Sequence, residues 1–120
     1  MLNKTLTKWV GYHFSTGPYT GKDYLSFQRS MRNDLKKQAN ANGLELHSFH
    51  GNHYNFCAVL RNTDTGKFVY VLIPDVRFWP DEWIKSVLYR TMKHEKDWVG
   101  GQNNHCPWAE IGRQASRLTA

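Results

Sequence analysis

The chain has 120 residues, 40% hydrophobic and 14% aromatic, and this composition excludes a low-complexity or disordered protein. The 16 Lys and Arg exceed the 10 Asp and Glu, which gives a formal net charge of +6 and a pI of about 9.5. That excess suits a nucleic acid or nucleoprotein partner. The length predicts a single domain over residues 1–120, with a core at 20–101 and a tail at 102–120.

The cysteine count and the N-terminus bear on cellular location. Two cysteines, Cys57 and Cys106, are too few for a disulfide framework, so we expect reduced thiols. The start of the chain, MLNKTLTKWVGYHF, lacks the apolar run of a signal peptide, and no stretch of about 18 apolar residues occurs. We therefore expect a cytoplasmic protein without a membrane partner.

The first elements in chain order are an extension and a helix. Residues 5–14 are predicted to form a strand in an N-terminal extension, before the Gly/Pro-rich loop STGPYTG. From Lys22 to about Ala41 the pattern predicts an amphipathic helix that ends at Asn42-Gly43. Its apolar stripe is Tyr24, Phe27, Met31 and Leu35.

Three strands are predicted next, at residues 44–50, 54–61 and 68–73. A two-residue turn at Gly51-Asn52 would pair Leu46 with Cys57. The turn NTDTGK would pair Leu60 with Val69. One sheet face would then form a core wall of Phe49, Phe56, Ala58, Leu60, Val69, Val71 and Ile73. The other face is too apolar to be exposed to solvent, so we expect the N-terminal strand, the tail helix or a partner to cover it.

Two further helices complete the prediction. One begins at Pro80 and carries the apolar stripe Trp83, Ile84, Val87, Leu88 and Met92. The other begins at Pro107 and carries Trp108, Ile111, Ala115 and Leu118 on one side. The fold class is therefore α+β: helix, three-stranded antiparallel sheet and helix, with an N-terminal extension and a C-terminal helical tail.

The first helix gives the clearest candidate binding surface. At about 100° per residue, its cations fall together opposite the apolar stripe, while Asp23 and Asp34 lie on the flank. Arg61 and Lys67 flank the second hairpin and add to the basic set. Tyr19, Trp79 and Trp98 are aromatic residues that can stack on bases. The alternative for the tryptophans Trp79, Trp83, Trp98 and Trp108 is a place in the core. The predicted binding residues are Lys22, Arg29, Arg32, Lys36, Arg61 and Lys67.

Histidines and cysteines suggest a metal site as a second possibility. Two imidazoles of the first hairpin, with a thiol and a tail residue, can complete a tetrahedral zinc site. The spacing matches no standard zinc finger, and a polar turn beside a buried free cysteine explains the same residues. The candidate ligands are His50, His53, Cys57, His105 and Cys106.

Catalytic motifs are absent from the sequence: it has no nucleophile elbow, phosphate-binding glycine loop or paired metal-binding carboxylates. We therefore expect no enzyme and no cofactor other than this zinc. A hidden nuclease is the enzymatic alternative, because His94 with Glu95, or His53 with Asn52 and Asn55, resembles parts of nuclease sites.

Two resemblances to known protein families bear on the function of this chain. The order helix, three strands, helix resembles the double-stranded RNA-binding domain, which grips phosphates with cations at the start of its second helix. Here that turn reads PDEW and carries Asp81 and Glu82, which repel phosphate. The run FVYVLIPDVRFWPDEW with RTMKHEKDWVGGQN is similar to small proteins of phages and bacterial mobile elements, which also occur as modules of large polyvalent proteins. The matching residues are Asp75, Val76, Arg77, Trp83, Lys96, Asp97, Trp98, Gly100 and Gly101.

The second resemblance implies an accessory protein in the cytoplasm of a bacterial host. Such proteins often serve element transfer or disable host defences, including CRISPR nucleases. The expected function is non-enzymatic: the chain binds and inhibits a host nucleoprotein defence machine, as anti-CRISPR proteins do, through its basic helix face. The alternatives are a nucleic-acid-binding module used in mobile-element transfer and a zinc-stabilised interaction domain.

Overall fold

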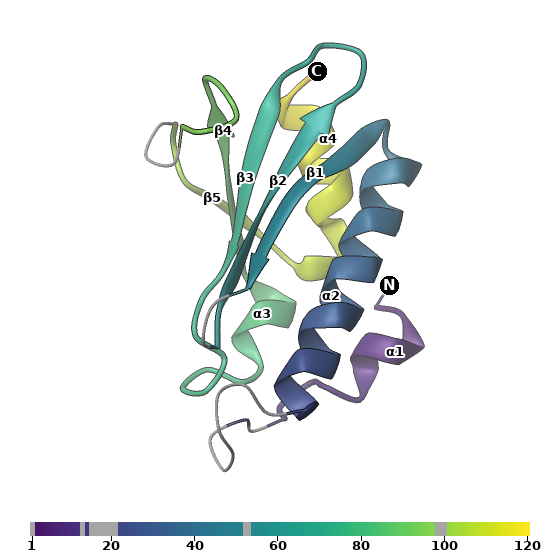
Figure 1. The fold of residues 1–120 in the computed structure, drawn as a ribbon, viewed down its shortest axis with the longest axis vertical. Coiled ribbons are helices and arrows are strands. Elements are labelled where there is room, and N and C mark those ends of the chain that lie inside the picture. Colours follow the sequence, from purple (N-terminus) through teal and green to yellow (C-terminus); the bar gives the residue numbers. More distant parts are fainter. Residues whose placement is uncertain (1, 13, 15–21, 52–53, 98–100) are drawn as a thin grey trace.

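A curved five-stranded antiparallel sheet carries the helices on one of its faces (Figure 1). The computed structural model describes residues 2–12, 14, 22–51, 54–97 and 101–120. The elements are α1 (Lys4–Thr7), α2 (Lys22–Ala41), β1 (Leu44–Gly51), β2 (Phe56–Asn62), β3 (Phe68–Ile73), α3 (Glu82–Lys85), β4 (Val87–Met92), β5 (Asn104–Cys106), the 3-10 helix η1 (Trp108–Glu110) and α4 (Ile111–Leu118). The strand order is β1-β2-β3-β4-β5. The α+β class is as predicted, but the three-stranded sheet is wrong, because five strands lie in the described part of the chain.

Helix α2 follows its sequence prediction. Its stripe is buried against the sheet, and Ala39 extends the stripe by one turn. Gly43 has φ +75°, a conformation that side chains with a Cβ rarely adopt, and so it reverses the chain into β1. The buried members of the stripe are Tyr24, Phe27, Met31, Leu35 and Ala39.

The two hairpins differ in how well their turns predicted the register. In β2–β3, Asn62 N–H donates to the Lys67 carbonyl at 2.8 Å and Leu60 lies opposite Val69, as expected. In β1–β2 the predicted two-residue tip is wrong, because Gly51 pairs with Phe56 and leaves four residues between them. A β-bulge between Leu46 and Ser48 then shifts the register further.

The bulge redistributes β1 between the two faces of the sheet. Leu44 and Leu46, which the predicted register leaves out of the core wall, pack against the core, as Phe49 does. Tyr54, expected in β2, precedes that strand and is buried. Its carbonyl accepts the Val76 N–H at 2.9 Å, and this bond takes the residue out of the hairpin ladder.

The helix predicted from Pro80 is mostly a strand. Only Glu82–Lys85 are helical, and residues 87–92 form β4 beside β3, with Leu88 opposite Leu72. The spacing of Trp83 and Val87 suits a helix, but VLYRTM also alternates, and Val and Thr favour strands. Pairing with β3 decides in favour of the strand.

The N-terminal strand is also wrong. Residues 4–7 form the short helix α1, because the Asn3 side chain caps it by accepting the Leu6 N–H at 2.9 Å. Leu6 and Trp9, three residues apart, are both buried against the core. Residue 13 and residues 15–21 of the predicted extension and loop lie outside the described residues.

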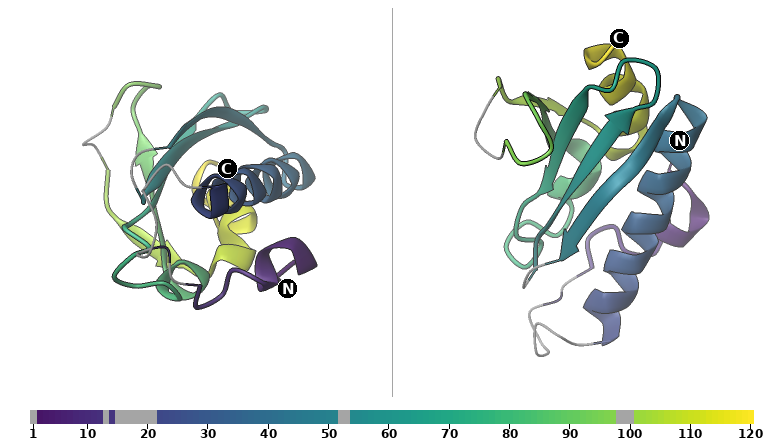
Figure 2. Two further views of the ribbon diagram at one scale, coloured as in Figure 1. Left: turned by 60° about the horizontal axis from the view of Figure 1, so that its bottom comes forward. Right: turned by 45° about the horizontal axis from the view of Figure 1, so that its top comes forward.

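The tail helix is confirmed, and it packs beside α2 within the concave side of the sheet (Figure 2). Gly112 N–H donates to Gln38 Oε1 at 2.9 Å, and Gln38 Nε2 donates to the Trp108 carbonyl at 3.0 Å. Trp108, Ile111 and Ala115 are buried, as predicted.

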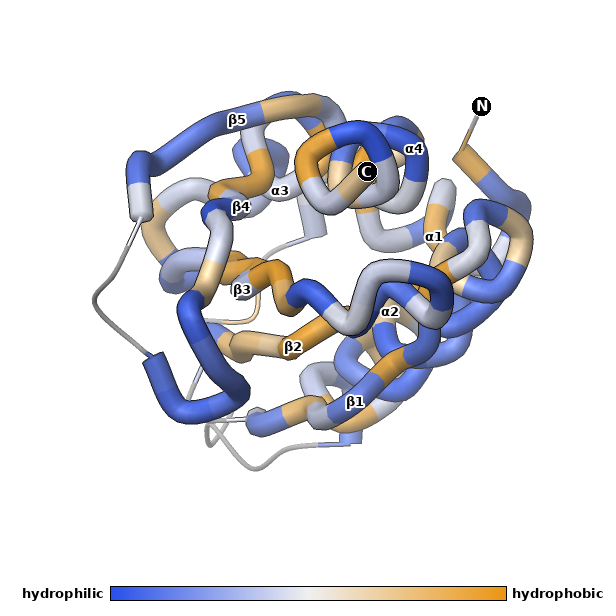
Figure 3. The backbone as a smooth tube through the Cα atoms, turned by 90° about the horizontal axis from the view of Figure 1, so that it is seen from above, coloured by the Kyte–Doolittle hydropathy of each residue, from blue (hydrophilic) through white to orange (hydrophobic). Residues whose placement is uncertain are grey.

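Helices α1 and α4 lie on the same side of the sheet as α2 (Figure 3), so neither covers the second sheet face as expected. On that face the Arg90 guanidinium lies over the ring of Tyr70 at 4.5 Å. Phe68 has the His47 ring against it at 5.2 Å between centroids. Polar side chains of the sheet itself therefore shield part of this apolar surface.

Candidate polyanion-binding face and adjoining groove

A row of four exposed cations follows the solvent side of α2. Because these positions fall opposite the buried stripe, packing the stripe against the sheet turns the cations outward. The ion pairs found within the described part of the chain all lie elsewhere. We call Lys22, Arg29, Arg32 and Lys36 the cationic row.

The acidic residues of α2 are turned to its other flank. The Asp34 carboxylate accepts from Trp108 Nε1 at 2.7 Å and from Gln38 Nε2 at 3.0 Å. Asp23 accepts from the Tyr12 hydroxyl, and this hydrogen bond raises the pKa of Tyr12. Asp34 is half-buried and Asp23 is exposed, and neither forms an ion pair with the row among the described residues.

Arg61 and Lys67 do not join the row. Arg61 Nη1 lies 3.4 Å from Glu45 Oε1, and Arg61 belongs to the β2 residues that face away from the core. Lys67 Nζ donates to the Ala120 carbonyl at 3.3 Å, beside the C-terminus. The predicted set of six is thus divided, and only the α2 cations form one surface.

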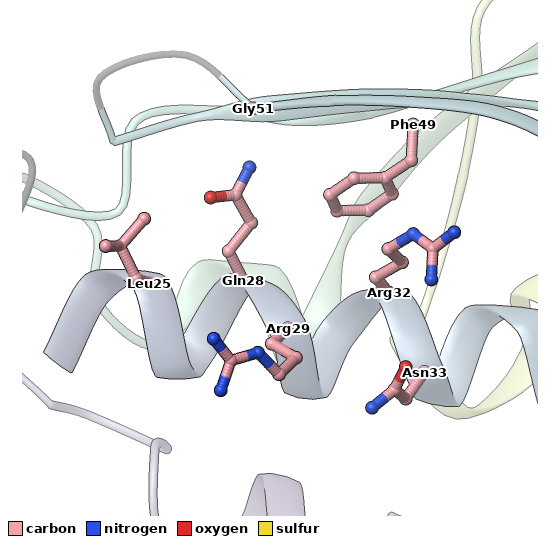
Figure 4. A pocket seen from close by; sticks show the side chains of 7 residues that line it. All are labelled: Leu25, Gln28, Arg29, Arg32, Asn33, Phe49 and Gly51. Atoms are coloured by element: carbon pink, nitrogen blue, oxygen red, sulfur yellow. The ribbon is translucent and has the colours of Figure 1, made fainter. Parts of the chain in front are cut away.

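A groove runs between α2 and β1, directly beside the row (Figure 4). Its volume is about 590 Å³. Gln28 extends toward Gly51, where a Cβ would lie 1.4 Å from Gln28 Nε2, so the glycine lets the helix side chain approach the strand. The lining residues are Leu25, Gln28, Arg29, Arg32, Asn33, Phe49 and Gly51.

Sequence reasoning missed the groove, because its two walls come from different elements. Arg29 and Arg32 were predicted to face solvent, but nothing in the sequence shows that β1 lies beside them. The helical pattern finds one wall, and the strand pattern finds the other. Only the packing of α2 on the edge of the sheet joins them.

The predicted metal ligands are spread across the sheet. His50 lies opposite Cys57 in β1–β2, but His105 lies in β5, three strands beyond Cys57 in the row Cys57, Leu72, Leu88, His105. At about 4.8 Å per strand that separation is about 14 Å, too far for one zinc ion.

The other two predicted ligands do not complete a site. Cys106 faces the core, where burial raises the pKa of its thiol to about 11. His53 lies outside the described residues. Among the residues that are described, no group of three or more His, Cys, Asp or Glu is placed to hold a metal.

The residues suspected of nuclease chemistry make contacts within and beside one turn. His94 Nδ1 accepts the Lys96 N–H at 3.2 Å within a turn after β4. Glu95 lies 3.4 Å from His47 Nε2, which ties this turn to β1. Asn52 and His53 of the other suspected group lie outside the described residues.

Two exposed aromatic residues project from the loop between β3 and α3. Phe78 and Trp79 are 67% and 57% exposed, whereas Trp83 and Trp108 are buried in the core. The loop is held by Arg77, which pairs with Asp75 at 2.6 Å and lies over the Tyr54 ring. Trp79 was a predicted stacking residue and Phe78 was not; the other two candidates, Tyr19 and Trp98, lie outside the described residues.

Comparison of the chain with protein-family models, with curated proteins and with solved structures finds no match. Among the described residues, the helices are too short or too polar for a bilayer-spanning segment.

Proposed function

We propose that this chain is a non-enzymatic binding protein that attaches to an anionic partner, a host nucleoprotein complex, through the cationic row of α2. The observation that supports this function is the segregation of charge on one helix. Four cations are exposed without a carboxylate partner in the described chain, while Asp23 and Asp34 are held on the other flank. Such a surface attracts phosphates or acidic side chains.

The proposed consequence of binding is inhibition of a host defence machine, as in anti-CRISPR proteins. The support for this part is the resemblance to phage and mobile-element proteins. In this proposal the 14.1 kDa chain acts by occupying a surface of the machine in a stoichiometric complex. Its basic charge directs it to the guide RNA, the DNA or an acidic protein patch of the machine.

The test is capture of bacterial nucleoprotein complexes from a host lysate, with and without nuclease treatment. Wild type is compared with the double variant Arg29→Glu/Arg32→Glu and with Lys93→Glu/Lys96→Glu, which makes the same charge change on an exposed turn after β4. We expect the row variant to lose at least tenfold in capture and the control variant to retain it. Equal capture by both variants would refute the proposed role of the row.

Inhibition is tested on the captured complex. The purified chain is titrated into a nuclease assay of that complex, and we expect cleavage to fall in proportion to the chain added until one equivalent is bound. Cleavage that is unaffected at full occupancy would leave a binding protein without inhibitory function and refute this part of the proposal.

A second candidate function is naked nucleic-acid binding in element transfer. The observation that favours it is the exposed pair Phe78 and Trp79 beside Arg77, because exposed aromatic side chains can stack on bases. Replacing Arg29, Arg32 and Lys36 by alanine should lower the salt slope of single-strand binding by about 2, since each phosphate contact on a single strand contributes about 0.7. Binding that is absent or insensitive to salt would exclude this function.

A further inference from the structure

Strand β1 is an edge strand that borders the groove through Phe49 and Gly51. It stands first in the sheet order and pairs only with β2 among the described strands. In an antiparallel pair, alternate residues direct their N–H and C=O groups away from the partner strand, so an edge strand presents a row of unused donors and acceptors. The bulge at Leu46/Ser48 interrupts this row, but Ser48–Gly51 continue in regular register beside α2.

The groove supplies three kinds of contact beside that backbone. Leu25 is 45% exposed and Phe49 is half-buried, and together they offer apolar contact. Gln28 and Asn33 add side-chain amides. Arg29 and Arg32 add two cations, which belong to the cationic row and have no carboxylate partner among the described residues.

We propose that the groove between α2 and β1 binds an extended acidic segment of a partner protein, which adds to the β1 edge as a further antiparallel or parallel strand. This inference rests on the proposed function, because it uses part of the cationic row, and it names the chemistry of the partner. Edge addition beside a helix is a known mode of peptide recognition: backbone hydrogen bonds give affinity, and side-chain pockets give specificity.

The dimensions of the groove fit a short strand. The lined part of α2 runs from Leu25 to Asn33, which at 1.5 Å per residue is about 12 Å. At about 3.4 Å per residue, that length accommodates about four residues of an extended peptide. The regular part of β1 beside it, Ser48–Gly51, also has four residues.

The spacing of the cations predicts where the acidic residues of the partner lie. Arg29 and Arg32 are three residues apart, a rise of about 4.5 Å along α2. Side chains on one side of a strand are about 6.8 Å apart, and two long arginine side chains can span that difference. We therefore expect Asp or Glu at positions i and i+2 of the bound segment.

A polypeptide fits this site better than a nucleic acid does. An edge strand offers N–H donors and C=O acceptors in alternation, and another strand matches both. A phosphate backbone has acceptors but no donors for the carbonyl groups. Leu25 and Phe49 also favour apolar side chains at the groove wall.

The first experiment selects a library of displayed random ten-residue peptides on the immobilised full chain. We expect enrichment of sequences with Asp or Glu at alternate positions. Binding should fall at least tenfold with Arg29→Glu/Arg32→Glu and stay within twofold with Lys93→Glu/Lys96→Glu. Absence of enrichment, or enrichment that both variants reduce equally, would overturn the inference.

A second experiment tests strand addition through the peptide backbone, so that folding of the protein is not at risk. The best selected peptide is N-methylated at single amides along its length. Methylation should weaken binding at least tenfold at every second amide, and hardly at the amides between, because only one set faces β1. Equal effects at neighbouring amides would exclude a paired strand and overturn the inference.

The two proposals can fail separately. If the cationic row is needed to capture nucleoprotein but no acidic peptide is selected, strand addition is refuted and the proposed function is supported. If a single-stranded oligonucleotide binds the row while selected peptides do not compete with it, the groove is not the site of the anion and the inference also falls. If acidic peptides bind as described but no nucleoprotein is captured, the proposed nucleoprotein partner is refuted and the proposed peptide site is supported.

Discussion

The Asp34 carboxylate connects three parts of the chain, and its removal tests how much these contacts stabilise the fold. It accepts from Trp108 Nε1 at 2.7 Å, from Gln38 Nε2 at 3.0 Å and from the side chain of Asn3, which caps α1. Trp108 has no exposed surface. In the variant Asp34→Ala the indole N–H therefore loses its acceptor within the fold.

The expected loss of stability follows from these contacts. A buried donor without a partner costs about 1–3 kcal/mol. The amides of Asn3 and Gln38 are only half-buried and regain water, so we add about 0.5 kcal/mol for each. The free energy of unfolding should fall by about 2–4 kcal/mol, which for a domain of this size lowers Tm by roughly 10 °C.

Urea unfolding followed by circular dichroism measures this loss, with Asp64→Ala as a control that removes an exposed carboxylate. The pair Asp34→Ala and Trp108→Phe, with the double variant, gives a coupling energy of about 1–2 kcal/mol if the hydrogen bond is the cause. Capture of an anionic partner should be unchanged, since the row keeps its cations. Additive effects, or a loss below about 0.5 kcal/mol for Asp34→Ala, would refute the reasoning.

Three other changes test the packing and the buried thiol. Gly112→Ala should destabilise by about 1–3 kcal/mol in urea, because the new Cβ would lie 2.7 Å from Gln38 Cβ and 2.8 Å from its carbonyl oxygen. Thr119→Val should cost about 1–2 kcal/mol in thermal unfolding, because Asn62 Nδ2 donates to the buried Thr119 hydroxyl at 3.0 Å. Burial disfavours the Cys106 thiolate and raises its pKa to about 11. In a chain whose other cysteine is serine, alkylation by iodoacetamide should therefore rise about tenfold per pH unit from pH 8 to 10.

Each of these has an outcome that contradicts it. If Gly112→Ala has the same urea unfolding midpoint as wild type, α2 and α4 are not in close contact. An unchanged Tm for Thr119→Val would mean that water replaces the hydroxyl. An alkylation rate that levels off near pH 9 would show that the Cys106 thiol is solvated.

Some elements could be predicted from local signals in the sequence. Helix α2 has a continuous apolar stripe and a glycine stop at Gly43, which indicate its span and its C-terminal end without reference to any other element. The turn at Asn62–Lys67 sets the β2–β3 register, since the Asn62 side chain accepts the backbone N–H groups of the turn. The helix predicted over β4 and the two-residue β1–β2 tip also had local signals, at Pro80 and Gly51-Asn52, but both predictions were wrong because strand pairing overrode the signals.

Some features of the candidate site could likewise be predicted from local sequence, and others could not. The positions of Arg29 and Arg32 on the solvent side of a helix follow from periodicity alone. Other features depend on strand order and register, which the sequence does not encode locally. Examples are the pairing of Arg61 with Glu45 and the placement of His50 and His105 on different strands. The groove depends on the same information.

The sequence by itself therefore determined the charge, the amphipathic helix and the strongest strand, because these follow from neighbours within a few residues of the chain. The tertiary structure decided which strand lies at the edge, where β1 bulges and which carboxylates turn inward. Those features arise from contacts between segments far apart in the sequence, such as the hydrogen bond between Trp108 and Asp34 across 74 positions. The free energy of such contacts exists only once the whole sheet and its helices are packed together.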